Sequence, residues 1–242
     1  MMDAIILAGG KGTRLREFIG EDTPKPLAKI NGTPFLDLLI NRLEKFENVK
    51  NIILAVGYKK EKIIDRYKDK NNILFSEEKK SLGTGGAIKK ALSLAKSNEV
   101  LVLNGDSYSE FNPIELLKTH IEKKAEISIG YRFEKDTSRY GSLTIDKKTK
   151  KILKFNEKQA IQNLKKTSGF INSGVYVINK NVFDDFENLA GLDGLEKFSI
   201  ELDFFPKAVF TKKIFGFDIK TSFIDIGTPS SYHRAQSILN LG

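Results

Sequence analysis

The sequence predicts an α/β fold built on a mixed, mainly parallel sheet that is flanked by helices. In the first half of the chain, short apolar runs alternate with amphipathic segments. In the second half, strand-like runs follow one another with few helices between them. Strands joined by helices pair in parallel through right-handed crossovers, whereas strands joined directly tend to pair antiparallel. We therefore expect a parallel core with antiparallel additions at one edge.

The elements expected in the first half are buried strands and amphipathic helices. Each strand is a short apolar run, as expected for a strand that is covered on both faces. The strands are expected at Ala4–Ala8, Asn51–Val56, Ile73–Phe75 and Val100–Leu103. The helices are expected at Pro34–Phe46, Glu61–Tyr67, Gly85–Ala95 and Pro113–Lys123. In the second of these helices, Ile63, Ile64 and Tyr67 fall on one face, as a helix that packs on a sheet requires.

The second half is expected to extend the same sheet. Its strands are expected at Glu126–Arg132, Gly141–Ile145, Ile152–Asn156, Gly174–Ile178, Val209–Phe217 and Phe223–Asp225. Its helices are expected at Asn179–Phe186, around Phe198–Phe205 and at Ser230–Leu241. No repeat or low-complexity linker separates the halves, so we expect a single domain, 1–242, in which lobes of about 1–125 and 126–242 flank one cleft.

Composition limits the class of protein. A chain of 242 residues is long enough to bury roughly 70 to 75% of its unfolded surface. Lys and Arg total 40 against 31 for Asp and Glu, but the lysines are scattered among acids, which argues against a nucleic-acid-binding surface. The sequence has no cysteine, no secretory signal pattern and no apolar run of the roughly 20 residues that span a bilayer. We expect a cytoplasmic protein that binds neither nucleic acid nor membrane.

A glycine-rich turn follows the first predicted strand and carries the strongest chemical signal in the chain. It contains three glycines and two cations, namely Gly9, Gly10, Gly12, Lys11 and Arg14. Glycines let backbone N–H groups approach a phosphate closely, and the cations neutralise the charge of that phosphate. A polyphosphate is therefore the expected ligand of this turn.

Two common phosphate loops do not fit this turn. A P-loop needs Ser or Thr directly after its Gly-Lys, and here Gly12 follows Lys11. The dinucleotide-binding fingerprint needs a third glycine at the position that Leu15 occupies. A different phosphate site is favoured by Lys25, which has a proline on either side and is therefore presented from a stiffened loop.

Two aspartates follow predicted strands that are far apart in the sequence. Asp106 comes after the most apolar strand, and Asp225 precedes the last predicted helix. Ligands of open α/β sheets lie beyond the carboxyl ends of the strands, so both carboxylates are expected near the glycine-rich turn. Two carboxylates, with phosphate oxygens and water, make a Mg²⁺ site. The alternative for Asp225 is a turn or a helix cap, since Gly-Thr-Pro follows it.

Together these motifs resemble the sugar-phosphate nucleotidyltransferases, which join an NTP to a sugar 1-phosphate and release pyrophosphate. The resemblance covers essentially the whole chain and is carried by Leu7–Leu15 (LAGGKGTRL), Pro24–Leu27 (PKPL), Leu82–Ala87 (LGTGGA), Gly105–Ser107 (GDS), Gly174–Ile178 (GVYVI) and Asp225–Pro229 (DIGTP). It implies a Rossmann-like nucleotidyltransferase fold whose antiparallel additions form a sugar-binding lobe. It also implies a catalytic domain alone, without the left-handed β-helix of longer members.

The resemblance implies roles for individual residues. It assigns nucleotide binding to Leu7, Gly9, Gly10, Gly12, Thr13 and Gly83. It assigns the catalytic cations to Arg14, on the β- and γ-phosphates, and to Lys25, between the α-phosphate and the sugar phosphate. It assigns the metal to Asp106 and Asp225. The sugar phosphate is assigned to Gly141, Glu157, Lys158 and Asn172, and Gln159 stands where the family usually has a proline after the Glu-Lys pair.

The choice of base is expected to depend on an acid that precedes the second glycine-rich segment. Glu78 stands five positions before Gly83, where the family places a base-reading side chain. A carboxylate accepts hydrogen bonds from N1–H and the 2-amino group of guanine, which uracil and thymine do not offer. Glu77 offers the same chemistry, so both acids remain candidates and GTP is the expected donor. The small residues of Leu82–Ala87 would let the flat base approach the backbone.

Within the family, the resemblance is strongest to guanylyltransferases that act on a heptose 1-phosphate, followed by those that act on mannose 1-phosphate. The alternative in this class is another sugar phosphate with UTP, CTP or dTTP. A glycosyltransferase is disfavoured, because such enzymes often rely on Asp-x-Asp and Ser107-Tyr108 follows Asp106. A non-catalytic nucleotide-sensing subunit is the alternative from another class, and it would be expected to have lost Lys25 or an aspartate. A homodimer is expected from the family alone.

Overall fold

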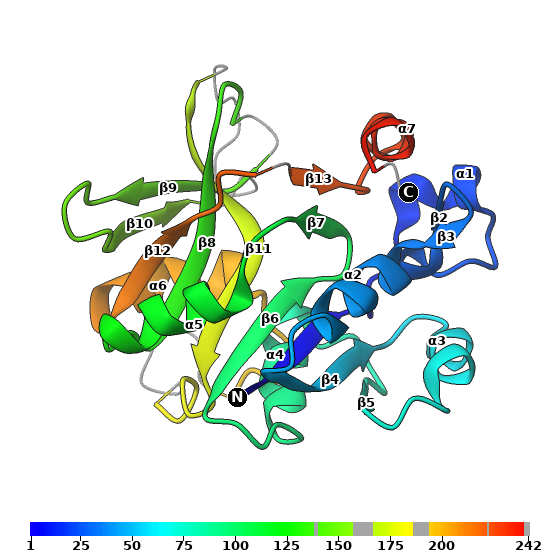
Figure 1. Cartoon of the computed structure of the whole chain (residues 1–242), viewed down its shortest axis with the longest axis horizontal. Coiled ribbons are helices and arrows are strands. Elements are labelled where there is room, and N and C mark those ends of the chain that lie inside the picture. The colour runs from blue at the N-terminus through cyan, green and yellow to red at the C-terminus, as the bar shows by residue number, and fades with distance from the viewer. Residues whose placement is uncertain (138–139, 157–166, 186–193, 222, 240–242) are drawn as a thin grey trace.

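The computed structural model describes residues 1–137, 140–156, 167–185, 194–221 and 223–239. The described residues form a large sheet with helices on both of its faces (Figure 1). None of the described helices is long and apolar enough to cross a membrane. The fold is of the α/β class that the sequence predicts, with a parallel part and an antiparallel part in one sheet.

The first half of the chain supplies the parallel part of the sheet. Its strands are β1 (Met2–Leu7), β4 (Val49–Val56), β5 (Ile73–Glu77) and β6 (Glu99–Asn104). They lie in the order β6-β1-β4-β5, and each neighbouring pair is parallel. In the central strand, Ile5 is opposite Ile53 on one side and Val102 on the other. The strands predicted here are therefore confirmed, with small differences at their ends.

The second half of the chain supplies the antiparallel part. Its strands in the large sheet are β8 (Ile127–Glu134), β9 (Ser142–Ile145), β10 (Ile152–Asn156), β11 (Gly169–Asn179) and β12 (Ile214–Asp218). β11 joins the two parts, because it pairs antiparallel with β6, β8 and β9. β12 pairs in parallel with β8. The predicted antiparallel additions are confirmed, and they begin directly beside β6.

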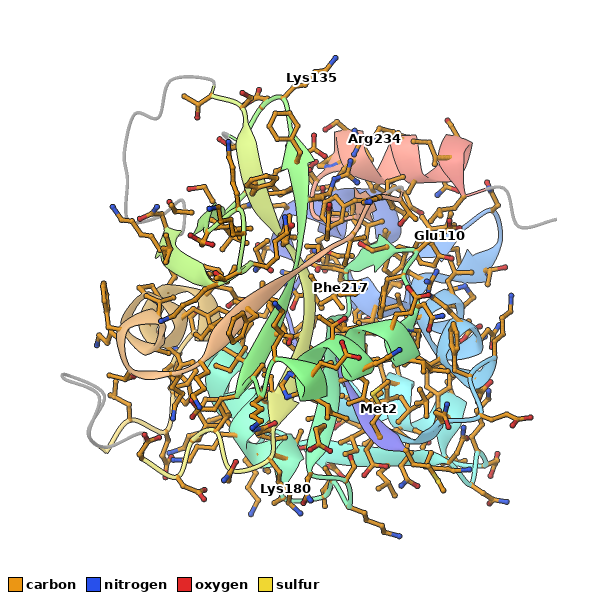
Figure 2. All side chains as sticks on the ribbon, turned by 60° about the vertical axis from the view of Figure 1, so that its left-hand side comes forward. Met2, Glu110, Lys135, Lys180, Phe217 and Arg234 are labelled. Atoms are coloured by element: carbon orange, nitrogen blue, oxygen red, sulfur yellow. The ribbon has the colours of Figure 1, made fainter. Side chains whose placement is uncertain are left out.

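Two hydrophobic clusters cover the two faces of the sheet, and side chains crowd both faces (Figure 2). One cluster contains residues of α4 (Gly83–Leu92) and α6 (Phe205–Thr211). The other contains residues of α2 (Phe35–Glu44), α3 (Lys60–Tyr67), α5 (Pro113–Glu122) and α7 (Pro229–Ile238). Successive side chains of a strand point to opposite faces, so Ile5 lies in the first cluster whereas Ala4 and Ile6 lie in the second.

Several short elements connect the larger ones at the carboxyl ends of the parallel strands. They are a 3₁₀ turn (Thr13–Leu15), α1 (Arg16–Ile19), a second 3₁₀ turn (Lys25–Leu27), the hairpin of β2 (Lys29–Ile30) and β3 (Thr33–Pro34), and the ribbon of β7 (Ser107–Ser109) and β13 (Phe223–Asp225). Except for β13, the sequence does not predict them, because they are too short to show a hydrophobic period.

The predicted helix over Asn179–Phe186 is wrong in the part that the structure describes. β11 continues to Asn179, which pairs with Glu99 of β6, and residues 180–185 form turns. The Asn179 side chain shares a hydrogen bond of 2.8 Å with His120 Nε2 and donates to the Ala125 carbonyl oxygen at 3.3 Å. These contacts with α5 and with Ala125, two residues before β8, hold the end of the strand in the sheet.

The predicted strand over Val209–Phe217 is also wrong at its start. α6 extends into this range, and β12 begins only at Ile214. Phe205, Ala208 and Val209 have helical spacing, and all of them are buried in the hydrophobic cluster that also contains residues of α4. Packing therefore overrides the strand preference of the β-branched Val209.

The other helices predicted in the second half are confirmed within different bounds. The helix predicted around Phe198–Phe205 is a π-helical turn, Ile200–Phe204, which leads into α6. The last helix, α7, begins at Pro229 and ends at Ile238. The predicted end of that helix lies partly outside the described residues.

Candidate active site

The ribbon of β7 and β13 brings the two predicted metal-binding aspartates together. Asp225, the last residue of β13, lies opposite Ser107 in the antiparallel register. The Ile226 N–H donates to the carbonyl oxygen of Asp106 at 2.9 Å. The two aspartates are therefore neighbours across the ribbon, although more than a hundred residues separate them in the sequence. The structure places this ribbon directly after β6, at the edge of the sheet where β1 also ends (Figure 1).

Gly105 fixes how Asp106 enters the site. Its N–H donates to the carbonyl oxygen of Leu7 at 3.0 Å, so the chain leaves β6 against the end of β1. A Cβ at this position would stand closer than 3.0 Å to the same carbonyl oxygen, a separation that real Cβ atoms do not show. The glycine is thus required by the close approach of two backbones, and it places Asp106 beside the glycine-rich turn.

Lys25 forms an ion pair with Asp106. Its Nζ lies 2.6 Å from Asp106 Oδ2, and the lysine side chain is only 14% exposed. Gly12, whose φ of 57° is in the left-handed region, makes room for this side chain, because a Cβ there would lie 2.6 Å from Lys25 Cβ. The same Nζ is 3.8 Å from the place where a Cβ on Gly227 would stand. The ammonium group therefore lies close to both aspartate-bearing segments.

Asp225 is held in place by hydrogen bonds to both of its carboxylate oxygens. Oδ1 accepts from the Gly227 N–H at 2.9 Å and from the Ser231 hydroxyl at 3.0 Å. Oδ2 accepts from the Tyr140 hydroxyl at 3.0 Å. The N-cap of α7 is Thr228, which forms a capping box with Ser231, so the alternative of a helix cap for Asp225 is wrong. The hydrogen bond from the Gly227 N–H shows that Asp225 does stabilise a turn. The same residue also lies beside Asp106, so the turn and the predicted pairing of the two aspartates occur together.

A pocket of 240 Å³ lies where β1, β6 and α4 meet. It is lined by Leu7, Gly9, Gly10, Ala55, Glu78, Ser81, Gly83, Thr84, Ala87, Asn104, Gly105 and Asp106. This lining contains most of the residues to which the sequence assigns nucleotide binding. Gly12, Thr13 and Arg14 are not part of it, and the last two are exposed in the 3₁₀ turn that follows β1.

Glu78 and Glu77, the two candidates for base recognition, have different surroundings in the structure. Glu78 lines the pocket, and its Oε2 accepts from the Leu82 N–H at 2.9 Å. Its Oε1 faces Gly9, where a Cβ would stand 3.0 Å away. Burial raises the pKa of Glu78, although the Leu82 N–H and the charge of Lys90 act in the opposite direction. Glu77 does not line this pocket and instead pairs with Lys60 at 2.9 Å.

Two residues that the sequence assigns to the sugar side are in direct contact. The Asn172 N–H donates to the Gly141 carbonyl oxygen at 3.0 Å. The Asn172 side chain donates to the Tyr176 hydroxyl at 2.8 Å and accepts from the Gly174 N–H at 3.0 Å. Glu157 and Lys158, the other two residues of this assignment, lie outside the described residues.

Sequence reasoning missed Asn104, which connects the pocket with the sugar side. It ends β6 and lines the pocket, and its amide lies against Gly174, where a Cβ would stand 2.7 Å from Nδ2. Among the residues that the structure describes, its Oδ1 is buried and has no hydrogen-bond partner. A free acceptor at the pocket wall is suited to a ligand donor. The sequence signal for this residue is its position at the end of an apolar strand, directly before Gly105.

Comparison with known proteins gives a family match over almost the whole chain. The model of the nucleotidyl transferase family matches residues 3–240. The chain is 38% identical over 241 residues to D-glycero-α-D-manno-heptose 1-phosphate guanylyltransferase of Aneurinibacillus thermoaerophilus, with 98% of both chains covered. It is 39% identical over 236 residues to the protein of the same name from Campylobacter jejuni, with 96% of this chain and 98% of that one covered.

Solved structures show the same similarity in three dimensions. The crystal structure of HddC from Yersinia pseudotuberculosis has a TM-score of 0.81 and 37% sequence identity to this chain. The comparison covers 98% of this chain and 99% of HddC. HddC has also been solved in complex with GMP-PN, and that structure has a TM-score of 0.80.

Proposed function

The chain belongs to the nucleotidyl transferase family, and from this premise we propose that it transfers GMP from GTP to D-glycero-α-D-manno-heptose 1-phosphate and releases pyrophosphate. The observation that supports the reaction class best is the ion pair of Lys25 with Asp106, because Asp106 lines the pocket that also contains Gly9 and Gly10. The guanylyl group and the heptose are supported by the two relatives that match over almost their whole length, because the names of both include them.

The chemistry asks for charge neutralisation and positioning more than for covalent work by the protein. An oxygen of the sugar phosphate attacks the α-phosphorus of GTP, a P–O bond forms, and the bond to the leaving pyrophosphate breaks. Two anions must be held together, and charge develops on the leaving group. We assign Lys25 to the α-phosphate and the attacking phosphate, and Arg14 to the β- and γ-phosphates. The attacking phosphate is already ionised near neutral pH, so the step needs no general base.

Mg²⁺ is proposed as the cofactor, and the donor set is consistent with this ion. Asp225 ends β13, and Asp106 directly precedes β7, the strand that pairs with β13, so the two carboxylates come from neighbouring segments. Mg²⁺ prefers hard oxygen ligands and is usually bound by one or two carboxylates together with substrate phosphates and water. When bound, the ion supplies positive charge for the phosphates. The Tyr140, Gly227 and Ser231 donors orient the Asp225 carboxylate for this role.

Guanine recognition is assigned to Glu78. Of the two acids considered, Glu78 lines the pocket and Glu77 pairs with Lys60 on α3. The ionised carboxylate of Glu78 would accept from N1–H and the 2-amino group of guanine. The glycines at 9 and 10, with Leu7 and Gly83, would surround the rest of the nucleotide. The sugar would be bound by Asn172 and Gly141, and we keep Glu157 and Lys158 in that set as a prediction from the sequence.

Mannose 1-phosphate is the second candidate acceptor. Relatives named mannose-1-phosphate guanyltransferase match at 32% and 31% identity, and the chain spans about 62% of their length. The lower identity places this candidate after the heptose. A non-catalytic nucleotide sensor is disfavoured, because Lys25, Asp106 and Asp225 are present and lie close together.

The test is a matrix of four NTPs against a set of sugar 1-phosphates, with pyrophosphate release as the measured quantity. GTP with the heptose 1-phosphate is expected to give the highest kcat/KM. Highest activity with UTP or dTTP would contradict the assignment of Glu78, and no pyrophosphate release with any pair would contradict the transferase itself. Cell fractionation and size-exclusion chromatography test the cytoplasmic location and the homodimer, which remain predictions.

A further inference from the structure

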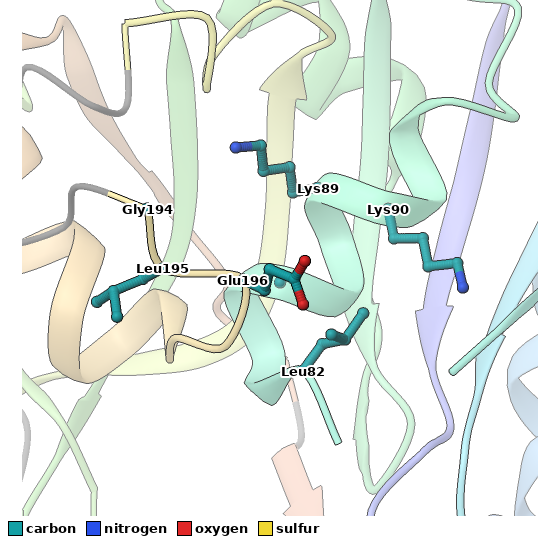
Figure 3. Close-up of a pocket in the computed structure, with 7 residues that line it drawn as sticks. Leu82, Lys89, Lys90, Gly194, Leu195 and Glu196 are labelled. Carbon is teal, nitrogen blue, oxygen red and sulfur yellow. The ribbon is translucent and has the colours of Figure 1, made fainter. Parts of the chain in front are cut away.

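A segment of the second half of the chain, Glu196–Glu201, packs directly against the start of α4. The Phe198 N–H donates to the Leu82 carbonyl oxygen at 3.0 Å. The Phe198 carbonyl oxygen accepts from the N–H of Gly85 at 3.0 Å and from that of Gly86 at 3.3 Å. Figure 3 shows the residues that lead into this segment, Gly194 to Glu196, beside Leu82 and α4. The segment Leu82–Ala87, which forms the start of α4 and is expected to approach the base, is thus attached to a distant part of the chain.

Two glycines of this segment, Gly85 and Gly86, serve the attachment. A Cβ on Gly85 would stand closer than 3.0 Å to the ring of Phe198, and one on Gly86 would stand equally close to the Glu196 carbonyl oxygen. Neither glycine lines the 240 Å³ pocket, whereas Gly83 and Thr84 do. The expectation that the small residues of this segment admit a base therefore applies to Gly83, Thr84 and Ala87, which line the pocket, and not to Gly85 and Gly86.

Thr84 connects the pocket wall with Glu201. The Thr84 hydroxyl donates to Glu201 Oε2 at 2.6 Å and accepts from the Ile200 N–H at 2.9 Å. The Ser199 hydroxyl donates to the same carboxylate oxygen at 2.9 Å. One oxygen of a half-buried carboxylate therefore binds two hydroxyl groups, and one of them belongs to the wall of the pocket.

The other carboxylate oxygen of Glu201 faces the sugar side. The Tyr176 hydroxyl lies 3.5 Å from Oε1 and donates to it. The same hydroxyl accepts from Asn172 Nδ2 at 2.8 Å, and the Asn172 N–H donates to the Gly141 carbonyl oxygen at 3.0 Å. A chain of hydrogen bonds thus runs from Thr84 through Glu201 and Tyr176 to Asn172.

We propose that Glu201 is a positioning residue that couples the nucleotide pocket to the sugar side of the site. This role of Glu201 rests on the proposed function, because that function assigns GTP to the Thr84 end of the hydrogen-bond chain and the sugar phosphate to the Asn172 end. Hydrogen bonds to a charged acceptor are stronger than neutral ones, and bonds that share a group depend on one another. Glu201 fixes the hydroxyl of Thr84 on one side and, through Tyr176, the amide of Asn172 on the other.

The test compares Glu201→Ala with Glu201→Gln and with the control Glu196→Gln. Alanine removes both acceptors. Glutamine keeps an oxygen for Thr84 and Ser199 and offers an N–H to the Tyr176 hydroxyl, so it is expected to rescue. Glu196 is an exposed acid on the same segment, and its side chain has no part in the hydrogen-bond chain.

Glu201→Ala is expected to raise the KM for GTP and the KM for the sugar 1-phosphate about tenfold each, the effect of losing one bond to a charged group. For Glu201→Gln, both KM values are expected to stay within about threefold of those of the wild type. For Glu196→Gln, both are expected to equal the wild-type values. Thr84→Val should raise the KM for GTP, and adding Glu201→Ala should not multiply that effect. Thermal unfolding of each variant separates these changes from a loss of folded protein.

Equal KM values for Glu201→Ala and Glu196→Gln would overturn the proposal. So would a Glu201→Gln variant as impaired as the alanine variant, because hydrogen bonding would then not be the cause. Equilibrium dialysis with GTP alone distinguishes a failure of the proposed function from a failure of the role of Glu201. A wild-type protein that does not bind GTP contradicts the proposed function, whereas equal GTP dissociation constants for the wild type and Glu201→Ala contradict only the role of Glu201.

Discussion

Lys25 and Asp106, 81 positions apart in the sequence, form an ion pair with 2.6 Å between Nζ and Oδ2. The Asp106 side chain lines the pocket and is 39% exposed, so its carboxylate lies at the boundary between the pocket and solvent. The ammonium neutralises a carboxylate that we assign to a divalent ion. Lys25 and that ion therefore compete for the same oxygen until a nucleotide phosphate offers the lysine a new partner.

This competition predicts that Lys25→Ala binds divalent metal more tightly when no nucleotide is present. Removing a positive charge a few ångströms away strengthens the attraction of the carboxylates for a cation, and we expect about a tenfold lower dissociation constant. Titration with Mn²⁺, followed by electron paramagnetic resonance, measures this directly. Lys29→Ala, a change of an exposed lysine nearby, is the control. Weaker Mn²⁺ binding by Lys25→Ala than by the wild type would contradict the competition.

The same substitution is predicted to have the opposite effect on turnover. Lys25→Ala should lower kcat by roughly 10² to 10³, the range found when a preorganised group that stabilises developing charge is removed. Pyrophosphate release at saturating substrates is the measurement, again with Lys29→Ala as the control. An unchanged kcat would mean that Lys25 has only a structural role in its loop.

Asp225→Asn is predicted to reduce activity more than stability. The asparagine oxygen can still accept from Gly227 and Ser231, so most of the local structure should persist. The lost negative charge should raise the Mg²⁺ concentration needed for half-maximal activity about tenfold. A titration of activity with Mg²⁺ and a thermal melt are compared for Asp225→Asn and for Asp65→Asn, an exposed acid on α3. A large drop in Tm with an unchanged Mg²⁺ requirement would favour the turn alternative for Asp225.

The sequence predicts those parts of the fold and site that depend on local patterns. The strands β1, β4, β5 and β6 are short apolar runs, and their carboxyl ends carry Gly9 and Asp106 as expected. The pairing of β7 with β13 is not visible in the sequence, because it joins two three-residue strands that are far apart in the chain. Consequently Asp106 and Asp225 are predicted as a pair from their positions after predicted strands, from their chemistry and from the family resemblance, but not from this pairing.

Contacts between distant segments explain most of what sequence reasoning misses. The sequence predicts that Asn179 begins a helix, yet its pairing with Glu99 and its hydrogen bond to His120 hold it in a strand. Glu201 has an unremarkable position in a helical pattern, and only the packing of its segment on α4 brings it to Thr84. Local propensity carries no information on partners that are distant in the sequence. Tertiary contacts decide both the strand conformation of Asn179 and the position of Glu201.

Glu78→Gln is predicted to weaken the preference for guanine. A neutral amide can accept from only one of the two guanine donors, so the ratio of kcat/KM for GTP over ITP, which lacks the 2-amino group, should fall about tenfold. Glu77→Gln is the matched control, because Glu77 pairs with Lys60 outside the pocket. An equal loss of preference in both variants would contradict the assignment to Glu78.

The raised pKa of Glu78 predicts a pH dependence with a definite sign. Burial favours the protonated form, so between the unfolded pKa and the higher folded pKa the native state binds more protons than the unfolded state. Stability should therefore rise slightly as pH falls through this window, whereas GTP affinity should decrease, because only the carboxylate accepts from both donors. Dialysis and thermal melts between pH 7 and 4.5 are expected to show opposite trends in the wild type, and Glu78→Gln should lose both contributions.

Two glycines near the pocket are predicted to respond differently to the same change. Gly105→Ala places a Cβ against the Leu7 carbonyl oxygen, so β6 or β1 must shift, and the free energy of unfolding should fall by about 1 to 3 kcal/mol. Gly10→Ala meets no atom within 4 Å and should leave the free energy of unfolding within about 0.5 kcal/mol of the wild type. Because Gly10 lines the pocket, its added methyl group should instead raise the dissociation constant for GTP. Urea denaturation and equilibrium dialysis on both variants separate the two effects, and a strongly destabilised Gly10→Ala would show that this glycine is needed for folding instead of for nucleotide access.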